Sequence, residues 1–233
     1  MRAVVQERYG RPEDLVVRDL PMPVPGDGDV LVQVRGSSVH PDVWHVITGQ
    51  PAVLRLMGSG VRRPSRQVPG TDLAGVVEAV GPAVPRFGPG DEVFGQIVSN
   101  IQWRNAGAWA GYATVRADRL APKPARISFE EAASVPTSGL IALQSLRDQG
   151  RVAAGQRILI NGAAGGVGGF AVQIAKAMGA DVTGVDLSDK LDLVAAAGAD
   201  HVIDAADDYT RLSERYDLVY TSPGTTPSRA SGM

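Results

Sequence analysis

A glycine-rich segment, Asn161–Gly168, separates a short apolar run from a helical pattern and constrains the fold more than any other feature. The run before it, Arg157–Ile160, is typical of a strand buried on both faces. After the segment, apolar residues recur at helical spacing, and this pattern stops near Gly179. The apolar residues are Val167, Phe170, Ala171, Ile174, Ala175 and Met178. A strand, a tight glycine turn and a helix in this order predict part of a βαβ unit in a parallel sheet.

The composition of this turn predicts a binding site for a dinucleotide. Positions without side chains let the backbone approach a pyrophosphate, and the helix N-terminus offers unpaired N–H groups to it. Compared with the pattern G-x-G-x-x-G, Ala163 replaces the first glycine, while Gly168 permits close packing of helix on strand. A merely tight turn is the structural alternative. The residues predicted to hold the cofactor here are Ala163, Ala164, Gly165, Gly166, Val167 and Gly168.

An acidic residue, Asp186, lies about 20 positions further on, at the end of the next predicted strand, as in the Rossmann fingerprint. Its carboxylate is predicted to accept hydrogen bonds from the adenosine ribose hydroxyls, which slightly favours NAD over NADP. Lys190 is close enough in sequence to offer a counter-charge to a 2′-phosphate, which favours NADP instead. The alternative is that Asp186 caps the next helix, a role open also to Ser188 and Asp189.

Glycine and proline positions divide the chain into two parts. Residues 1–122 contain short β-rich runs cut by turns, which predicts a small, barrel-like β domain. In residues 123–221 strands alternate with helices, which predicts a dinucleotide-binding domain with a parallel sheet. Four strands are recognisable there, whereas a complete dinucleotide fold has two halves of three strands each. Residues 222–233 are small, polar and turn-prone, and they are predicted to form a disordered tail.

Individual strands and helices can be predicted from these runs. The strands predicted in the first part are Ala3–Val5, Leu15–Val17, Val30–Val34, Leu73–Val80 and Asp91–Phe94. Those predicted in the second part are Arg157–Ile160, Val182–Val185, His201–Ile203 and Asp217–Tyr220. Helices are predicted to begin at Ser128, which Glu130 and Glu131 follow in the first turn, and to span Leu187–Ala197 up to Gly198.

Composition excludes several classes of function. The net charge of the 233 residues is −2, so a nucleic-acid or anionic-membrane surface, which needs a basic excess, is not expected. The absence of cysteine removes disulfides, thiolate catalysis and zinc sites built on thiolates. No run approaches the roughly 20 apolar residues of a membrane span, and the charged start lacks the apolar core of a secretory segment. The predicted location is cytoplasmic.

Taken together, several segments resemble the medium-chain dehydrogenase/reductase superfamily, specifically its zinc-independent quinone-oxidoreductase branch. The resembling segments, spread between Met1 and about Gly224, are Ser37–Asp42, Pro69–Val77, Pro89–Gly95, Glu130–Pro136, Ala163–Gly168, Ala171–Lys176 and Gly198–Asp204. The resemblance implies an α/β protein with a GroES-like β-barrel domain, a partial Rossmann domain with a doubly wound parallel sheet, and a cleft between the two domains. It does not specify a substrate.

The resemblance also bears on metal binding. Zinc-dependent relatives have a Cys in the first motif and a His-Glu pair in the second, and here those positions hold Val39, Thr71 and Asp72. The four-Cys structural zinc lobe is absent as well. His40 and His45 alone are an incomplete set for tetrahedral zinc. The sequence therefore predicts no metal site.

Without zinc, no Lewis acid lowers the pKa of an alcohol, and hydride transfer from NADH or NADPH to a quinone or a conjugated carbonyl or alkene is the favoured chemistry. His40, at a position that is commonly Asn in these relatives, is predicted to hydrogen-bond the substrate oxygen or to supply a proton. Asp42 is predicted to orient His40. Their structural alternatives are a histidine bonded to backbone and a cap on a short turn.

Other residues are assigned from the same resemblance. Thr137 and Ser138 fall where relatives approach the nicotinamide ribose, and Thr137 is predicted to bind the cofactor, with helix capping as the alternative. Trp44 and Trp103 either shape an apolar pocket for the acceptor or pack in the core. Relatives continue through further Rossmann strands, so the chain is expected to be truncated at its C-terminal end.

This expected truncation leaves two other functions open. The chain is either an oxidoreductase, whose turnover the truncation impairs, or a non-catalytic dinucleotide-binding protein, and an alcohol dehydrogenase is a third alternative. Its predicted partner is a small-molecule acceptor. A homodimer is possible, but relatives often pair through a sheet edge that is expected to be missing here.

Overall fold

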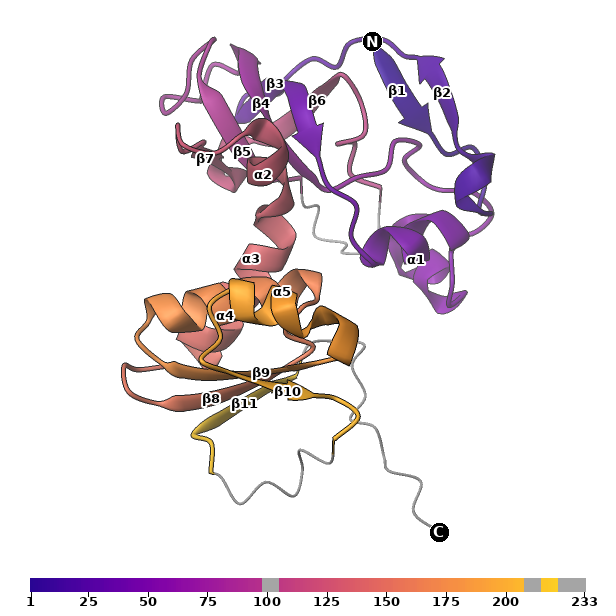
Figure 1. Cartoon of the computed structure of the whole chain (residues 1–233). Coiled ribbons are helices and arrows are strands. Elements are labelled where there is room, and N and C mark those ends of the chain that lie inside the picture. Colours follow the sequence, from indigo (N-terminus) through magenta and orange to yellow (C-terminus); the bar gives the residue numbers. More distant parts are fainter. Residues whose placement is uncertain (98–104, 208–214, 222–233) are drawn as a thin grey trace. The chain divides into compact units, whose positions relative to one another are not determined.

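The computed structural model describes residues 1–97, 105–207 and 215–221. The chain divides into two units, Met1–Thr137 and Ser138–Met233, and each unit contains its own main sheet (Figure 1). Two features predicted from the sequence, the tail at residues 222–233 and the role of Trp103, lie outside the described residues.

The first unit is built on a five-stranded antiparallel sheet in the order β6-β3-β4-β5-β7. Its strands are β3 (Asp29–Ser37), β4 (Asp72–Val80), β5 (Glu92–Gln96), β6 (Tyr112–Arg116) and β7 (Leu120–Pro122). A second pair, β1 (Arg2–Val5) with β2 (Val16–Asp19), is antiparallel and carries one further bridge from Ala3 to Ala110. The core of the unit gathers alternate residues of the main sheet, among them Val30, Val32, Leu73, Val77, Val93 and Val115.

Short helical segments connect these strands. They are η1 (Pro12–Asp14), α1 (Asp42–Thr48), the π-helical η2 (Arg55–Ser59), η3 (Ala117–Arg119) and α2 (Phe129–Ser134). The predicted helix start at Ser128 is confirmed, because its hydroxyl accepts from the amide of Glu131 and its own amide donates to the Glu131 carboxylate. This reciprocal pair is a capping box.

The division between the units falls inside α3 (Pro136–Leu143), later than the boundary at residue 122 that the sequence pattern predicts. The physical reason is that α2 packs on the first sheet, with Ala132 and Ala133 against Ala74. Lys123 adds to this attachment, since its buried ammonium group pairs with Glu92 at 3.1 Å and donates to the Ile127 carbonyl at 2.7 Å. The connecting segment therefore folds with the β unit.

The second unit is built on a four-stranded parallel sheet in the order β10-β9-β8-β11 (Figure 1). Its strands are β8 (Arg157–Asn161), β9 (Asp181–Asp186), β10 (His201–Asp204) and β11 (Leu218–Thr221). Its helical segments after α3 are the π-helical η4 (Gln144–Gln149), α4 (Gly166–Ala177), η5 (Ser188–Lys190) and α5 (Leu191–Ala196). Both α4 and α5 lie on one face of the sheet, as expected when crossovers of one hand follow one another.

All four strands predicted for this unit are present, and the predicted parallel sheet is confirmed. The pairing of α4 with the sheet is reinforced by Lys176, which bonds both carboxylate oxygens of Asp200 at 2.8 and 2.7 Å. The Lys176 ammonium group, followed by the Val182 amide, holds the pKa of Asp200 below its usual range. In the described part of the chain, no helix is long and apolar enough to cross a membrane.

Candidate functional site

The glycine-rich segment forms a tight turn between β8 and α4, held from below by the end of β9. Gly162 takes a positive φ of 76°, which suits glycine. The amides of Gly162 and Ala163 both donate to the Val185 carbonyl, at 2.9 and 3.1 Å, and the amide of Gly165 donates back to Gly162 at 3.0 Å. The amide of Ala164 donates to the Asp186 carboxylate, so all four amides of residues 162–165 already have acceptors within the protein.

The amides free to bind an anion are those that open α4. Gly166, Val167 and Gly168 have no acceptor for their N–H groups among the described residues, as is usual for the first turn of a helix. No side chain caps this helix, whose N-cap residue is Gly165. Three N–H groups at the positive end of a helix dipole, beside exposed glycines, are an arrangement that binds phosphate groups.

Gly168 is where the helix approaches the strand most closely. A Cβ atom built on it would lie 1.9 Å from the carbonyl oxygen of Gly162, far inside van der Waals contact. The neighbouring Gly169 has room, since its Cβ atom would meet nothing closer than the Ala163 carbonyl oxygen at 3.8 Å. The requirement for glycine at position 168, which the sequence predicts, is therefore a packing requirement.

Asp186 is tied to the glycine turn. One carboxylate oxygen accepts from the amide of Ala164 at 2.8 Å and the other from the amide of Leu187 at 2.9 Å. The predicted alternative, a cap on the next helix, is not what the structure shows, because the N-cap residue of η5 is Leu187 and no side chain caps that helix. A carboxylate has about four acceptor positions, so Asp186 retains the capacity to accept further hydrogen bonds. Lys190 is exposed at the end of η5.

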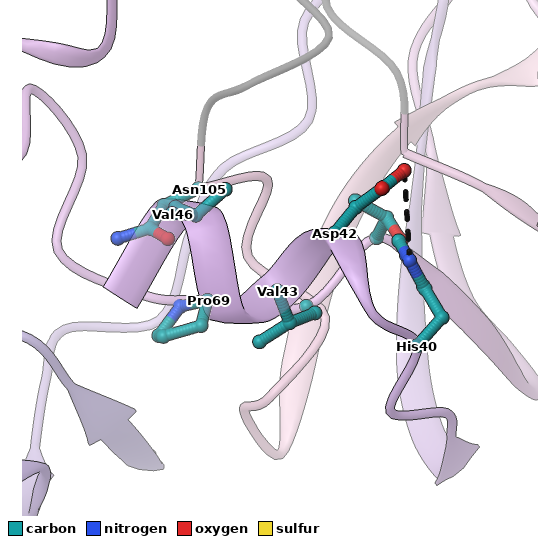
Figure 2. A pocket seen from close by; sticks show the side chains of 8 residues that line it. His40, Asp42, Val43, Val46, Pro69 and Asn105 are labelled. Atoms are coloured by element: carbon teal, nitrogen blue, oxygen red, sulfur yellow. Dashed lines mark hydrogen bonds and ion pairs between the residues drawn. The ribbon is translucent and has the colours of Figure 1, made fainter. Parts of the chain in front are cut away.

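In the first unit, His40 lies between the side chains of Thr71 and Asp42. Its Nε2 atom is 2.7 Å from Thr71 Oγ1, and its Nδ1 atom is 3.8 Å from Asp42 Oδ2 (Figure 2). The His40 side chain is 12% exposed and that of Asp42 is 36% exposed. The alternative of a histidine bonded to backbone is not found, since both of these partners are side chains. Asp42 lies in the first turn of α1 without capping it.

A small pocket adjoins His40, between α1 and the segment that leads into β4 (Figure 2). Its lining comprises His40, Asp42, Val43, Val46, Pro69, Gly70, Thr71 and Asn105. Trp44 is not part of this lining, and with 53% of its surface exposed it is not a core residue either. At the other end of the pocket Asn105 is buried, and its carboxamide nitrogen donates to Gln6 at 2.9 Å and to the Arg66 carbonyl at 2.8 Å.

A buried carboxylate, Asp72, lies next to Thr71 and organises the residues around it. It is 1% exposed and accepts hydrogen bonds from the Thr137 amide at 3.0 Å, the Thr137 hydroxyl at 2.6 Å and the Ser38 hydroxyl at 3.3 Å. The Thr137 hydroxyl also accepts from Gln96. Thr137, predicted as a cofactor ligand, is thus engaged in a structural network, and one acceptor position of its hydroxyl remains for a ligand.

The hydroxyl of Ser138, the residue after Thr137, lies beside the glycine turn. A Cβ atom built on Gly166 would be 3.6 Å from the Ser138 hydroxyl, so this hydroxyl lies close to the first turn of α4. Sequence reasoning named Ser138 but did not include it among the predicted ligands. It missed three further polar residues that form side-chain hydrogen bonds, Gln6, Gln96 and Asn105, because nothing in their local pattern distinguishes an amide with a partner in the fold from an exposed one. Among residues 1–97, 105–207 and 215–221, no group of three His, Cys, Asp or Glu side chains is placed to hold a metal ion.

Comparison with known proteins agrees with this architecture. Residues 26–125 match the family described as the alcohol dehydrogenase GroES-like domain, and residues 166–227 match the family described as zinc-binding dehydrogenase. The quinone-oxidoreductase homolog of spinach, Spinacia oleracea, is 33% identical over 210 residues, which are 88% of this chain and 61% of that protein. The chain therefore spans about three fifths of the length of this relative.

Solved structures give the same result. The quinone oxidoreductase from Coxiella burnetii is 30% identical, with a TM-score of 0.81 over 94% of this chain and 67% of that one. The Escherichia coli quinone oxidoreductase, solved as a complex with NADPH, is 27% identical, with a TM-score of 0.74 over 89% of this chain and 60% of that one. The predicted α/β fold, a GroES-like domain with a Rossmann-type parallel sheet, is confirmed. The chain belongs to the zinc-independent, quinone-oxidoreductase-like branch of the medium-chain dehydrogenase/reductase superfamily.

Proposed function

We propose that the protein is an NAD(P)H-dependent, zinc-independent oxidoreductase that transfers hydride to a quinone or to an activated, conjugated carbonyl or alkene. The observation that carries the proposal is the glycine turn that leads into α4: the first three amides of this helix lack acceptors in the described structure, and Gly168 permits its close approach to the turn. The membership in a branch whose named relatives are quinone oxidoreductases supports it.

The residues fit a dinucleotide. The N–H groups of Gly166, Val167 and Gly168 would hold the pyrophosphate, while Ala163, Ala164 and Gly165 shape the turn without side-chain bulk. Asp186 would accept hydrogen bonds from the adenosine ribose, and it also fixes the turn through Ala164. The hydroxyl of Thr137, which has one acceptor position left, would accept a further hydrogen bond from the cofactor. When bound, the reduced nicotinamide supplies the hydride.

The protein residues act on the oxygen of the acceptor. Hydride addition to a quinone or an enone builds negative charge on this oxygen, and a donor aimed at it lowers the barrier. His40 lines a pocket and its Nδ1 atom is beyond hydrogen-bond range of Asp42, so this nitrogen remains available to a ligand. We assign His40 as the group that donates to the acceptor oxygen, and Asp42 as the residue that orients it. Neither role uses a metal ligand.

A paired measurement tests the proposed function. Fluorescence titration of the full chain with NADH and NADPH should show saturable binding, and mixing with NADPH and 1,4-benzoquinone should oxidise the nucleotide at about 1 per second or faster. Treatment with a chelator should leave this rate unchanged, because no metal takes part. Binding without hydride transfer to any acceptor would favour a non-catalytic dinucleotide-binding protein, and no binding at millimolar nucleotide would refute the proposal.

The choice between NAD and NADP gives a second prediction. Replacing Lys190 by Ala removes the nearest predicted cation for a 2′-phosphate and should weaken NADPH binding about threefold to tenfold while NADH binding stays the same. Replacing Asp186 by Asn should weaken NADH binding more than NADPH binding, because the carboxylate would accept hydrogen bonds from the adenosine ribose hydroxyls of NADH. Matched titrations of the two variants with both nucleotides measure this. Equal losses for both nucleotides in each variant would contradict the assignment of these two residues.

The acceptor is proposed to be a small molecule, without a nucleic-acid or membrane partner, and the cytoplasmic location stays a prediction from the sequence. So does the possible homodimer.

For the functional division of the chain we keep the domains predicted from the sequence: residues 1–122 as the GroES-like domain and residues 123–221 as the nucleotide-binding domain. In the fold, residues 123–137 belong to the same compact unit as the first sheet.

A further inference from the structure

We propose that Asp42 and Thr71 together hold neutral His40 in the tautomer with its hydrogen on Nδ1, so that the Nδ1–H group is the donor of the site. The Asp42 carboxylate selects this tautomer, and Thr71 is the positioning residue that fixes the ring by donating to Nε2. The tautomer follows from the geometry of the first unit alone. Its use in catalysis rests on the proposed function. The two parts are tested by separate measurements.

A neutral imidazole has one N–H group and one lone pair, and its two partners decide where each lies. The Nε2 atom of His40 is 2.7 Å from the Thr71 hydroxyl, which can either donate or accept. The Nδ1 atom faces a carboxylate oxygen of Asp42 at 3.8 Å, and this oxygen only accepts. The Thr71 hydroxyl is therefore compatible with either tautomer, whereas the Asp42 carboxylate is compatible only with the tautomer that has its hydrogen on Nδ1.

With the hydrogen on Nε2, the lone pair of Nδ1 would face the negatively charged Asp42 across a half-buried space. With the hydrogen on Nδ1, the N–H dipole faces this charge and the Thr71 hydroxyl donates to Nε2. The second arrangement is favourable at both nitrogen atoms. Because 3.8 Å exceeds hydrogen-bond range, Asp42 favours this tautomer without occupying the Nδ1–H group. This group remains available to an oxygen atom of a ligand in the adjoining pocket.

The position of Thr71 is itself fixed by its neighbours. Its carbonyl accepts from the amide of Ile97 at 2.7 Å. Gly70 before it takes a φ of 86° beneath the Trp109 indole, where a Cβ atom would lie 2.3 Å from the ring. Asp72 after it is held by Thr137 and Ser38. The hydroxyl is therefore presented by a backbone that is restrained on both sides, as a positioning role requires.

The resemblance gives this pair a context. Thr71 stands at the position where zinc-dependent relatives have a histidine ligand. Here the residue at this position bonds another side chain, His40, and among the described residues no group of three possible metal ligands is found. In this chain a hydrogen-bonded donor thus takes the role of the electrophile that polarises the acceptor oxygen.

The tautomer is tested by long-range proton–nitrogen NMR of the uniformly ¹⁵N-labelled full chain at about pH 8.5, about two units above the ordinary histidine pKa. The chain has three histidines, and His45→Gln and His201→Gln variants assign their signals. His45 is an internal reference, because its Nδ1 atom lies 2.7 Å from the Gln50 carbonyl, which only accepts. We expect His40 to show a protonated Nδ1 and an unprotonated Nε2, like His45. A protonated Nε2 in the wild-type chain would overturn the proposal.

Two substitutions test the role of the hydroxyl. Thr71→Val keeps the shape and removes the hydroxyl. The His40 Nδ1 should stay protonated, because Asp42 still faces it, but the Nε2 signal should move toward that of a nitrogen without a hydrogen-bond donor. Thr71→Ser should retain the wild-type signals. An unchanged His40 spectrum in Thr71→Val would show that the hydroxyl does not position the ring. The wild-type spectrum remains decisive even if this variant folds poorly.

The catalytic part is measured with the same variants. Thr71→Val should lower kcat/KM for 1,4-benzoquinone about tenfold, a fraction of the effect of losing a donor outright, with unchanged NADPH affinity, and Thr71→Ser should restore most of the loss. Hydride transfer that is equally fast in Thr71→Val would overturn the catalytic part. If no variant and no wild-type protein transfers hydride, the proposed function and the catalytic part fail together, while the NMR result still decides the tautomer.

Discussion

Replacing Gly168 by Ala should destabilise the second unit by about 3 kcal/mol and abolish most nucleotide binding. The added Cβ atom would lie 1.9 Å from the carbonyl oxygen of Gly162, so α4 and the turn after β8 must move apart. This movement opens the packing of Ala171 and Val172 in the core and displaces the three N–H groups that would hold the pyrophosphate. Urea unfolding of the full chain measures the first effect and NADPH titration the second.

Gly169 supplies the matched control. It lies in the same helix, one residue further on, and its Cβ atom would make an ordinary contact at 3.8 Å. Gly169→Ala should therefore leave nucleotide binding unchanged and raise stability by up to about 1 kcal/mol, since Ala is the better helix former. If Gly168→Ala behaved like Gly169→Ala, the close packing of α4 on the turn would not be what holds the site together.

Replacing Asp72 by Asn should destabilise the first unit by about 3 kcal/mol. The carboxylate is 1% exposed, and it acts only as an acceptor. Its donors are the amide and the hydroxyl of Thr137 and the hydroxyl of Ser38. An Asn side chain of the same shape turns one acceptor into an NH₂ group that faces these donors. At least one of them then loses its partner inside the protein, and the cost is that of a buried unsatisfied polar group.

Two further variants make this result specific. Asp19→Asn changes an exposed carboxylate on β2 and should alter stability by less than about 0.5 kcal/mol. Thr137→Val removes the shorter of the two bonds from Thr137, so the double variant Asp72→Asn/Thr137→Val should cost less than the sum of the single ones. Strict additivity in urea unfolding would show that the two residues do not share an interaction.

The sequence alone determined the parts of this protein that depend on short-range order. The apolar run before Asn161, the glycines after it and the helical stripe up to Met178 lie within one stretch of chain. Each has a local physical cause, so β8, the turn and α4 could be predicted together. The capping box at Ser128 is of the same kind. Two edge strands, β6 and β7, were not predicted, and each joins the sheet through a partner far from it in sequence: β6 pairs with β3 and β7 with β5.

Only the tertiary structure decided which distant side chains meet. His40 and Thr71 are 31 residues apart, and Asp72 and Thr137 are 65 apart. These pairs depend on the antiparallel register of β3 with β4, which places Ser37 opposite Leu73, and on the packing of α2 against the same sheet. A one-residue change of register would turn these side chains to the other face. The sequence names His40 and Asp42 as reactive groups, but the hydrogen bond that orients His40 exists only because the sheet brings Thr71 to it.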